Sequence, residues 1–262
     1  MICPLCHLNK NKKIFVASNV HGRIKYGKQK IAFYKCLDCD CVFPNTKLSH
    51  NFYVDYYPKT YQQAPPAIDK LWIDFSLRTG HKYLPESGTL LDVGCGRGGF
   101  LNALPPNLIA TGIDLNPQKI TGKNIIKANF LTYKFSDKFD VITFWHSLEH
   151  FKNPQKSVNK ALRLLNTHGK LIISIPNTNS LAFKVGQKDW FHLDSPRHLF
   201  LPNNVNIKQL FPKKYKISIN YSPYEFPLDL FWSLKNKPYY WVIYPLLKIF
   251  DRETMVVSVV KP

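Results

Sequence analysis

Four cysteines close to the start of the chain are spaced as two C-x2-C pairs: Cys3 with Cys6, and Cys36 with Cys39. Two such pairs can place four thiolates tetrahedrally around one zinc ion, each at about 2.3 Å. Because four cysteines leave no coordination position for water, the sequence predicts a structural zinc. The alternative is free or disulfide-bonded thiols. The opening residues MICPLCHLNK lack the apolar segment of an export signal, which argues against disulfides.

The surroundings of these cysteines have the pattern of a zinc ribbon over residues 1–45. KIFVASN and KIAFYKC are expected as short strands joined by a polar connection. Cys41 is expected to be a spare thiol or an alternative ligand. His7 directly follows the second cysteine of the first pair and could compete for the metal.

A second pattern lies in TLLDVGCGRGGF (89–100), an apolar run that ends in Asp92 and enters a glycine loop. Glycines let the backbone approach a ligand, and a helix start offers free N–H groups, so we expect strand, tight turn and helix. A second apolar run ends in Asp114, twenty residues past Gly94. A carboxylate there can accept both ribose hydroxyls of a nucleoside. The alternative for Asp114 is a helix N-cap.

The charge beside this loop favours one class of cofactor. Gly94, Gly96 and Gly99 satisfy G-x-G-x-x-G, the dinucleotide pattern, which is a weak match when it stands alone. The carboxylate of Asp92 would repel a pyrophosphate, but it suits a cationic ligand. S-adenosylmethionine carries a sulfonium and an ammonium and no phosphate, and it is therefore the cofactor we expect.

The stretch HSLEHF offers a different chemistry. His146, Glu149 and His150 have the H-x-x-E-H spacing of inverted zinc proteases. On an α-helix the two histidines would share one face and could bind zinc, with the glutamate as base. Nothing else in the chain supports a protease. The stretch follows an expected strand, where ligands of open α/β sheets bind.

The glycine segment LLDVGCGRGGFL resembles the first motif of class I S-adenosylmethionine-dependent methyltransferases, and the elements over residues 70–262 keep that family's order. NIIKANF resembles its third strand, and FDVITFWHSLEHFKNP its fourth strand with the helix or loop after it. ALRLLNTHGKLIISIPN resembles the helix, turn and strand that come next. The resemblance implies an α/β fold with a Rossmann-like seven-stranded sheet, behind a small N-terminal zinc ribbon.

Further motifs narrow the resemblance. A set of motifs resembles the type 23 subgroup of ubiquinone- and glycan-type small-molecule methyltransferases. In chain order these motifs are FDVI, LEHF, NP, IPNTNS and WFHLDSPRHLF. Members of that subgroup frequently carry an N-terminal zinc-binding segment. The resemblance therefore implies an S-adenosylmethionine-dependent methyltransferase.

The residues that the resemblance assigns to the cofactor follow the first three strands: Asp92, Gly94, Gly96, Asp114, Leu115, Asn129 and Phe130. Asp92 and the two glycines are expected at the methionine end and Asp114 at the ribose. Asn129 is expected to bind the adenine amine, although acidic residues are commoner there in the family. Phe130 is expected either to stack on the adenine or to belong to the core.

Methyl transfer needs nucleophile, methyl and sulfur nearly collinear, and a proton acceptor if the acceptor is a hydroxyl. The catalytic candidates are His146, Glu149 and His150. As the base, His146 ranks first, His150 second, and His192 or His198 third. Alternatives are a structural His150, a His198 that anchors the SPRHLF turn, and transfer without any base. Some quinone-type relatives hold a divalent cation near an equivalent Glu-His pair. Here His146 stands where that site would want a carboxylate, which argues against the metal.

The expected domains are the ribbon, a tyrosine-rich connector over 46–66 and a methyltransferase domain over 67–262. Within it, 177–205 is expected to form a lid over the acceptor, with Arg197 and His198 towards an anionic group. Trp190 and Phe191 are expected either to contact a ring or lipid of the acceptor or to form the core of the lid itself. The aromatic insertion 226–250 either packs over the active site or lies on a membrane surface. KYKISINY and TMVVSVVKP are expected as a closing antiparallel pair.

The chain has 36 Lys and Arg against 17 Asp and Glu, a net charge of +19. Such a balance favours anionic partners, although a lysine-rich proteome is an alternative cause.

The first hypothesis is O-methylation of a small molecule: a glycan, nucleotide-sugar, lipid-linked or quinone-like acceptor. The second is an RNA methyltransferase, although WHSL stands where many base-amine enzymes have N-P-P-Y or D-P-P-Y. The third is a non-catalytic binding module. We expect a cytoplasmic protein, with peripheral contact at the inner membrane face as an option.

Overall fold

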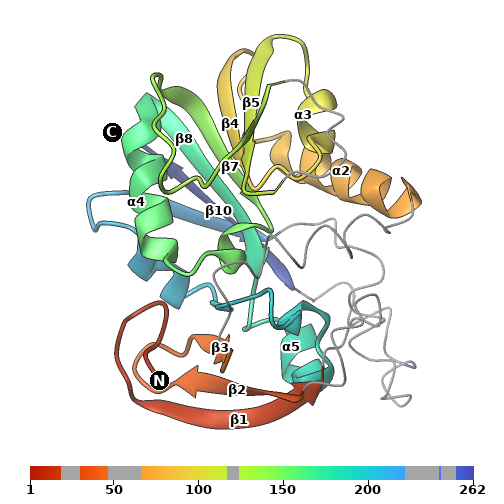
Figure 1. Cartoon of the computed structure of the whole chain (residues 1–262), viewed down its shortest axis with the longest axis vertical. Coiled ribbons are helices and arrows are strands. Elements are labelled where there is room, and N and C mark those ends of the chain that lie inside the picture. Colours follow the sequence, from red (N-terminus) through yellow and green to blue (C-terminus); the bar gives the residue numbers. More distant parts are fainter. Residues whose placement is uncertain (19–29, 47–65, 117–123, 222–241, 243–251) are drawn as a thin grey trace.

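The computed structural model describes residues 1–18, 30–46, 66–116, 124–221, 242 and 252–262. Nearly all of the predicted connector and of the predicted aromatic insertion lies outside the described residues. The described chain forms a three-stranded sheet at one end and a seven-stranded sheet at the other (Figure 1).

The elements of the N-terminal sheet are β1 (Asn11–Ser18), β2 (Lys30–Cys36) and β3 (Val42–Pro44). The strands of the large sheet are β4 (Gly88–Val93), β5 (Leu108–Asp114), β6 (Ile125–Lys127), β7 (Phe139–Trp145), β8 (Leu165–Pro176), β9 (Ile217–Tyr221) and β10 (Thr254–Val260). The α-helices are α2 (Pro66–Gly80), α3 (Gly99–Asn102), α4 (Pro154–Leu164) and α5 (Leu181–Gly186). Short 3-10 helices are η2 (Leu148–His150), η3 (Gln187–Asp189), η4 (Phe191–Leu193) and η5 (Asn206–Leu210).

The large sheet has the order β6-β5-β4-β7-β8-β10-β9. Strands β4 to β8 pair in parallel, and β10 pairs antiparallel with both β8 and β9, which confirms the predicted closing pair. The chain moves outward from β4 to β6 and then returns to β7. The carboxyl ends of β4 and β7 therefore border the switch point at which open α/β sheets bind ligands. This order confirms the predicted seven-stranded sheet.

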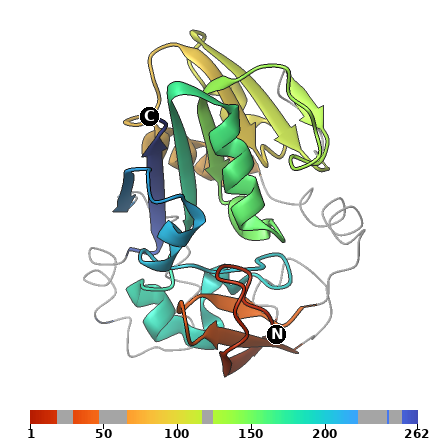
Figure 2. The ribbon, with the colours of Figure 1, turned by 90° about the vertical axis from the view of Figure 1, so that its left-hand side faces the viewer.

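The central strands are apolar because both faces of the sheet are covered. Leu90, Leu91, Ile142 and Phe144 are fully buried. Helix α4 lies on one face, while α2 and α3 lie on the other (Figures 1 and 2). Helix α4 follows Asn153 with a proline at its first position, where the missing N–H costs nothing.

The helix expected after the glycine loop is short. Helix α3 covers only Gly99–Asn102, since the two prolines that follow cannot supply helical N–H donors. The positive-φ Gly98 precedes it. A helix of one turn is enough to end the glycine loop, and the chain then runs directly into β5.

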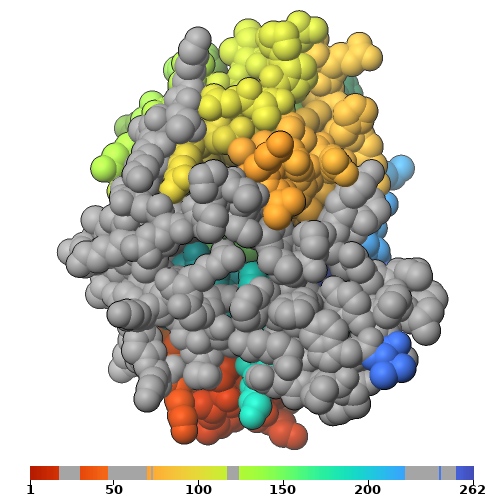
Figure 3. Space-filling view, turned by 90° about the vertical axis from the view of Figure 1, so that its right-hand side faces the viewer, coloured from red at the N-terminus to blue at the C-terminus, as the bar shows by residue number. Residues whose placement is uncertain are grey.

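The N-terminal unit, residues 1–18 and 30–46, is antiparallel in the order β1-β2-β3, as the ribbon pattern predicts. It lies beside α5 at the end of the molecule opposite α2 and α3 (Figures 1 and 3). The segment 177–205, the predicted lid, contains α5, η3 and η4 and passes between the N-terminal unit and the large sheet. Its function as a lid stays a prediction.

Candidate functional site

The glycine loop after β4 is shaped by two glycines in the left-handed region. Gly94 has a φ of 79° and Gly96 a φ of 55°. A Cβ at Gly94 would lie 2.5 Å from the Cβ of Ser147, whereas a Cβ at Gly96 would meet nothing within 4 Å. The loop therefore packs tightly against the residues after β7 and leaves open space at Gly96.

Asp114, at the end of β5, is bonded to this loop. Its Oδ2 accepts the N–H of Gly96 at 3.0 Å, and its Oδ1 accepts the N–H of Asn116 at 2.9 Å. Burial raises the pKa of Asp114 above its ordinary value, while these two N–H groups oppose the shift. The bond to Asn116 is of the capping kind that we considered as the alternative. Leu115, next to it, keeps 43% of its surface exposed.

Asp92, at the end of β4, is almost completely buried. Its Oδ1 accepts the hydroxyl hydrogen of Thr143 in β7 at 2.8 Å. Burial, with a contribution from the negative charge of Asp114, raises the pKa of Asp92 to about 7, and the Thr143 hydroxyl opposes this. The two strands of the switch point thus hold a carboxyl group that titrates near neutral pH.

The predicted adenine contacts lie after β6. The Asn129 side chain is exposed, and its Oδ1 accepts the N–H of Leu131 at 2.9 Å. Phe130 is buried and packs edge-on against Phe144 and Phe151, with ring centroids 5.8 and 6.3 Å away. The structure thus places Phe130 in the core, which was the alternative. The roles of both residues towards a cofactor stay predictions.

The loop after β7 begins at His146, whose φ of 45° turns the chain sharply. Its N–H donates to the carbonyl of Ser174, and the Ser147 hydroxyl donates to the carbonyl of Val93 at 2.6 Å. The three-residue 3-10 helix η2 then carries Glu149 and His150. His146 and His150 do not share a face of an α-helix, so the inverted-protease alternative lacks the helix that it requires.

Glu149 is fully buried and faces His146. Its Oε1 lies 3.4 Å from Nδ1 of His146. Burial raises the pKa of Glu149, but His146, His150 and a backbone N–H together lower it, so the net pKa lies below its ordinary value. The ring of His146 stacks on His192 with centroids 5.6 Å apart. A buried carboxylate that faces Nδ1 of a histidine is the arrangement that orients a general base.

Two further histidines lie near the same carboxylate: His150, the next residue, and His198 from segment 177–205. His150 Nδ1 lies 3.0 Å from the carbonyl of Arg197, and His198 Nδ1 lies 2.7 Å from the carbonyl of His192. Since carbonyls accept hydrogen bonds, both Nδ1 atoms carry the proton. Burial lowers the pKa of His150 to about 4 and that of His192 to about 3, so both are neutral at pH 7. Both contacts are compatible with the structural roles considered for His150 and His198.

Glu149, His150 and His198 each offer one ligand atom, and these atoms lie within 4.8 Å of one another. Two imidazoles and a carboxylate are ligands that zinc and related ions accept.

Sequence reasoning missed a second buried carboxylate, Glu253, whose Oε1 accepts the indole N–H of Trp190 at 2.6 Å. Its only signal in the sequence is a glutamate directly before the apolar strand β10.

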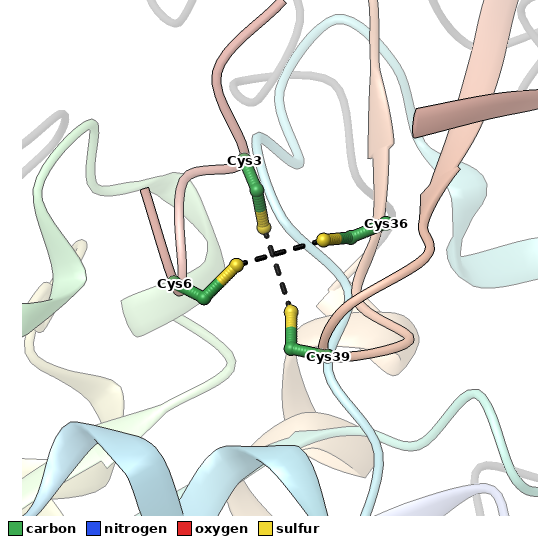
Figure 4. Close-up of side chains that lie close together, drawn as sticks. All are labelled: Cys3, Cys6, Cys36 and Cys39. Atoms are coloured by element: carbon green, nitrogen blue, oxygen red, sulfur yellow. Dashed lines mark hydrogen bonds between the residues drawn. The ribbon is translucent and has the colours of Figure 1, made fainter. Parts of the chain in front are cut away.

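The four predicted cysteines do come together (Figure 4). The Sγ atoms of Cys3 and Cys39 lie 3.6 Å apart, and those of Cys6 and Cys36 lie 3.5 Å apart. Four sulfurs at about 2.3 Å from one zinc would be about 3.8 Å apart, so the spacing fits a tetrahedral ion.

The two turns that carry these cysteines are alike. His7 and Asp40 directly follow the second cysteine of each pair, and both have a φ of 63°. Their N–H groups donate to the carbonyls of Cys3 and Cys36, respectively, at 3.0 Å. Cys41 is buried outside the group, with its Sγ 3.8 Å from the carbonyl of Leu201.

The sequence profile of the methyltransferase domain matches residues 64–215, more than half of the chain. The chain belongs to the methyltransferase domain family. The curated relatives include a ubiquinone biosynthesis O-methyltransferase of Coxiella burnetii, 32% identical over 120 residues, which are 39% of this chain and 51% of the relative. An uncharacterized protein of Methanocaldococcus jannaschii, MJ0638, is 38% identical over 96 residues, 35% of this chain and 42% of that protein. The chain spans about half the length of the curated relatives it matches.

Solved methyltransferase structures share the fold. The plantazolicin methyltransferase BpumL, in complex with a monoazolic desmethylPZN analog and SAH, has a TM-score of 0.53 at 17% identity, over 80% of this chain and 92% of that chain. A SAM-dependent methyltransferase from Archaeoglobus fulgidus has a TM-score of 0.51 at 19% identity, over 74% and 94% of the two chains. In the methyltransferase domain and the other described residues, no helix has the length and apolar character needed to cross a membrane.

Replacing Cys36 by Ser should remove the metal that we expect at the four cysteines. The remaining three sulfurs cannot complete a tetrahedral site, so bound zinc should fall from about one ion per chain towards zero. Atomic absorption on the purified protein measures this. Cys95→Ser, at a half-buried thiol in the glycine loop, is the matched control and should keep its zinc. Equal zinc in both variants would contradict the assignment.

Proposed function

We propose that the protein is an S-adenosylmethionine-dependent methyltransferase that acts on a small molecule, at oxygen. The observation that carries the proposal is the pair of carboxyl groups, Asp92 and Asp114, at the ends of the neighbouring strands β4 and β5, with Asp114 bonded to the loop at Gly96, where space is open. Negative groups at this loop fit a sulfonium and ammonium ligand and would repel a phosphate.

Each part of the cofactor has a partner in this arrangement. Asp92 is assigned to the ammonium end, together with the backbone at Gly94 and Gly96. Asp114 accepts the ribose hydroxyls through lone pairs that its two N–H bonds leave available. The exposed side chain of Leu115 is assigned to the adenine, with Asn129 and Phe130 further along.

His146 is assigned as the base. When bound, the cofactor supplies a methyl group on a cationic sulfur, which an acceptor oxygen attacks in line. With Nδ1–H of His146 directed at Glu149, Nε2 carries the lone pair that takes the proton from the acceptor hydroxyl. The ionised Glu149 then stabilises the imidazolium that forms, and His192 stacked on the ring keeps it in place.

The acceptor class rests on similarity and charge. The Coxiella relative is named an O-methyltransferase of ubiquinone biosynthesis, which supports an oxygen acceptor on a quinone-like, lipid-linked or glycan molecule. The net charge of +19 supports an anionic acceptor and contact with an anionic membrane surface. The same charge is the observation that favours the second candidate, an RNA acceptor. Retention on RNA with a steep salt dependence would distinguish it.

Asp114→Ala should lower the affinity for S-adenosylhomocysteine by about 100-fold, because it removes the charged acceptor of the ribose hydroxyls. Isothermal titration calorimetry measures the affinity. Asp137→Ala, at an exposed carboxylate after β6, is the matched control and should bind normally. Unchanged affinity in Asp114→Ala would remove the cofactor assignment.

Affinity for S-adenosylhomocysteine should fall as the pH is lowered from 8 to 6. The pKa of Asp92 is raised to about 7 in the ligand-free protein, so the carboxylate that attracts the ammonium is neutralised below that pH. The fall should approach about tenfold per pH unit on the acid side. In Asp92→Asn the affinity should be lower and the slope flat. A slope that persists in this variant would assign the titration to another group.

His146→Ala should slow methyl transfer by about 100-fold or more while leaving the affinity for S-adenosylhomocysteine intact, because only the proton acceptor is lost. Transfer is followed with methyl-labelled cofactor and separate lipid, glycan and RNA extracts, and the fraction that takes up label identifies the acceptor class. His81→Ala, at an exposed histidine after α2, is the control. Full activity in His146→Ala would retire it as the base.

A further inference from the structure

The N-terminal unit and the segment 177–205 share one hydrophobic core. Its residues come from both parts of the chain: Ala17, Ile31, Phe33 and Val42 from the unit, and Ala182, Trp190, Leu193 and Leu201 from the segment. Phe33, Trp190 and Leu201 are fully buried. Neither part could keep these side chains from water alone, so the two parts stabilise each other.

Hydrogen bonds join the same two parts. Val42 and Leu201 form an antiparallel bridge, with N···O distances of 3.1 and 2.7 Å. The side-chain amide of Asn206, just beyond the segment, donates to the carbonyl of Cys39 at 2.8 Å. Cys39 is one of the four clustered cysteines, so this bond connects Asn206 directly to a residue of the expected metal site.

The segment continues from these contacts to the histidines of the site. Trp190 donates to Glu253, and His192 stacks on His146. Further along, Nε2 of His198 lies 3.8 Å from Oε1 of Glu149, and the next residue, Leu199, donates its N–H to the Glu149 carbonyl at 2.8 Å. A continuous path of buried contacts therefore runs from the cysteine cluster to His146 and Glu149.

The cofactor half of the site is held differently. The glycine loop is bonded to Asp114 and to the carbonyl of Ile113 in β5, and Ser147 ties it to the loop after β7. These bonds lie within the large sheet. Folding of the cofactor half therefore depends on β4, β5 and β7.

We propose that the N-terminal unit is a positioning element for the acceptor half of the site: metal at the four cysteines fixes the segment that places His192 and His198. The unit is thus part of the active-site scaffold. Calling this half the acceptor half rests on the proposed function, whereas the mechanical link rests on the contacts alone.

Hydrogen–deuterium exchange on the full chain tests the link, with the metal present or removed by a chelator and its content checked by atomic absorption. On removal, amides of residues 190–203 should exchange at least about tenfold faster, while those of 93–102 and 108–114 should keep their rates. The affinity for S-adenosylhomocysteine should stay within about twofold. Unchanged exchange at 190–203 in the metal-free protein would overturn the proposal.

A single-bond variant covers the case in which metal removal unfolds the whole protein. Asn206→Asp keeps the oxygen that accepts the N–H of Asn203 and removes the donor to Cys39. It should retain its metal, exchange several-fold faster at 190–203 and transfer methyl more slowly with unchanged KM for the cofactor. The matched control is Asn204→Asp, which removes a side-chain amide that donates to the Tyr221 hydroxyl and not to the N-terminal unit. Equal behaviour of the two variants would overturn the link, whereas absent cofactor binding in all proteins would count only against the proposed function.

Discussion

The close contact between the glycine loop after β4 and the turn after β7 is the constraint on which the site depends. Gly94 has no room for a side chain because Ser147 lies against it, and Ser147 in turn donates to the carbonyl of Val93. This contact closes the switch point of the parallel sheet on one side. Open space remains at Gly96, and His146 directly precedes Ser147 in the turn that contacts the loop.

Buried carboxyl groups of unlike titration behaviour surround this point. Desolvation disfavours the ionised form, and it raises the pKa values of Asp92 and Asp114. Glu149 is buried at least as deeply, yet its pKa is lowered because His146 and His150 lie beside it and a backbone N–H donates to it. The proposed cofactor side thus gains from a cationic ligand, whereas the proposed acceptor side already contains Glu149, whose lowered pKa keeps it ionised beside His146.

The N-terminal unit packs against the segment that reaches the proposed acceptor side of the site. A zinc ribbon is small, and alone it would bury little apolar surface. Here its strands share Phe33 and Val42 with a core that includes Trp190 and Leu201. Methyltransferase domain and ribbon are therefore packed as one structure around the segment 177–205, and we infer that the metal supports the acceptor half through that segment.

The sequence by itself determined the features that depend on local spacing. Each C-x2-C pair places two thiolates within a few residues, so two such pairs predict a four-sulfur cluster; an acidic residue directly before a glycine loop likewise predicts the turn and the charge at Asp92. The seven-stranded sheet followed from the resemblance of the glycine segment, and of the elements after it, to class I methyltransferases. Only the tertiary structure decided which distant groups converge. His192 and His198 meet the His146 turn because segment 177–205 crosses the end of the large sheet, and Glu253, directly before β10, meets His192. It also decided that Phe130 lies in the core and that HSLEHF is no α-helix. Spacing cannot encode contacts that depend on strand order and on the packing of segments far apart in the chain.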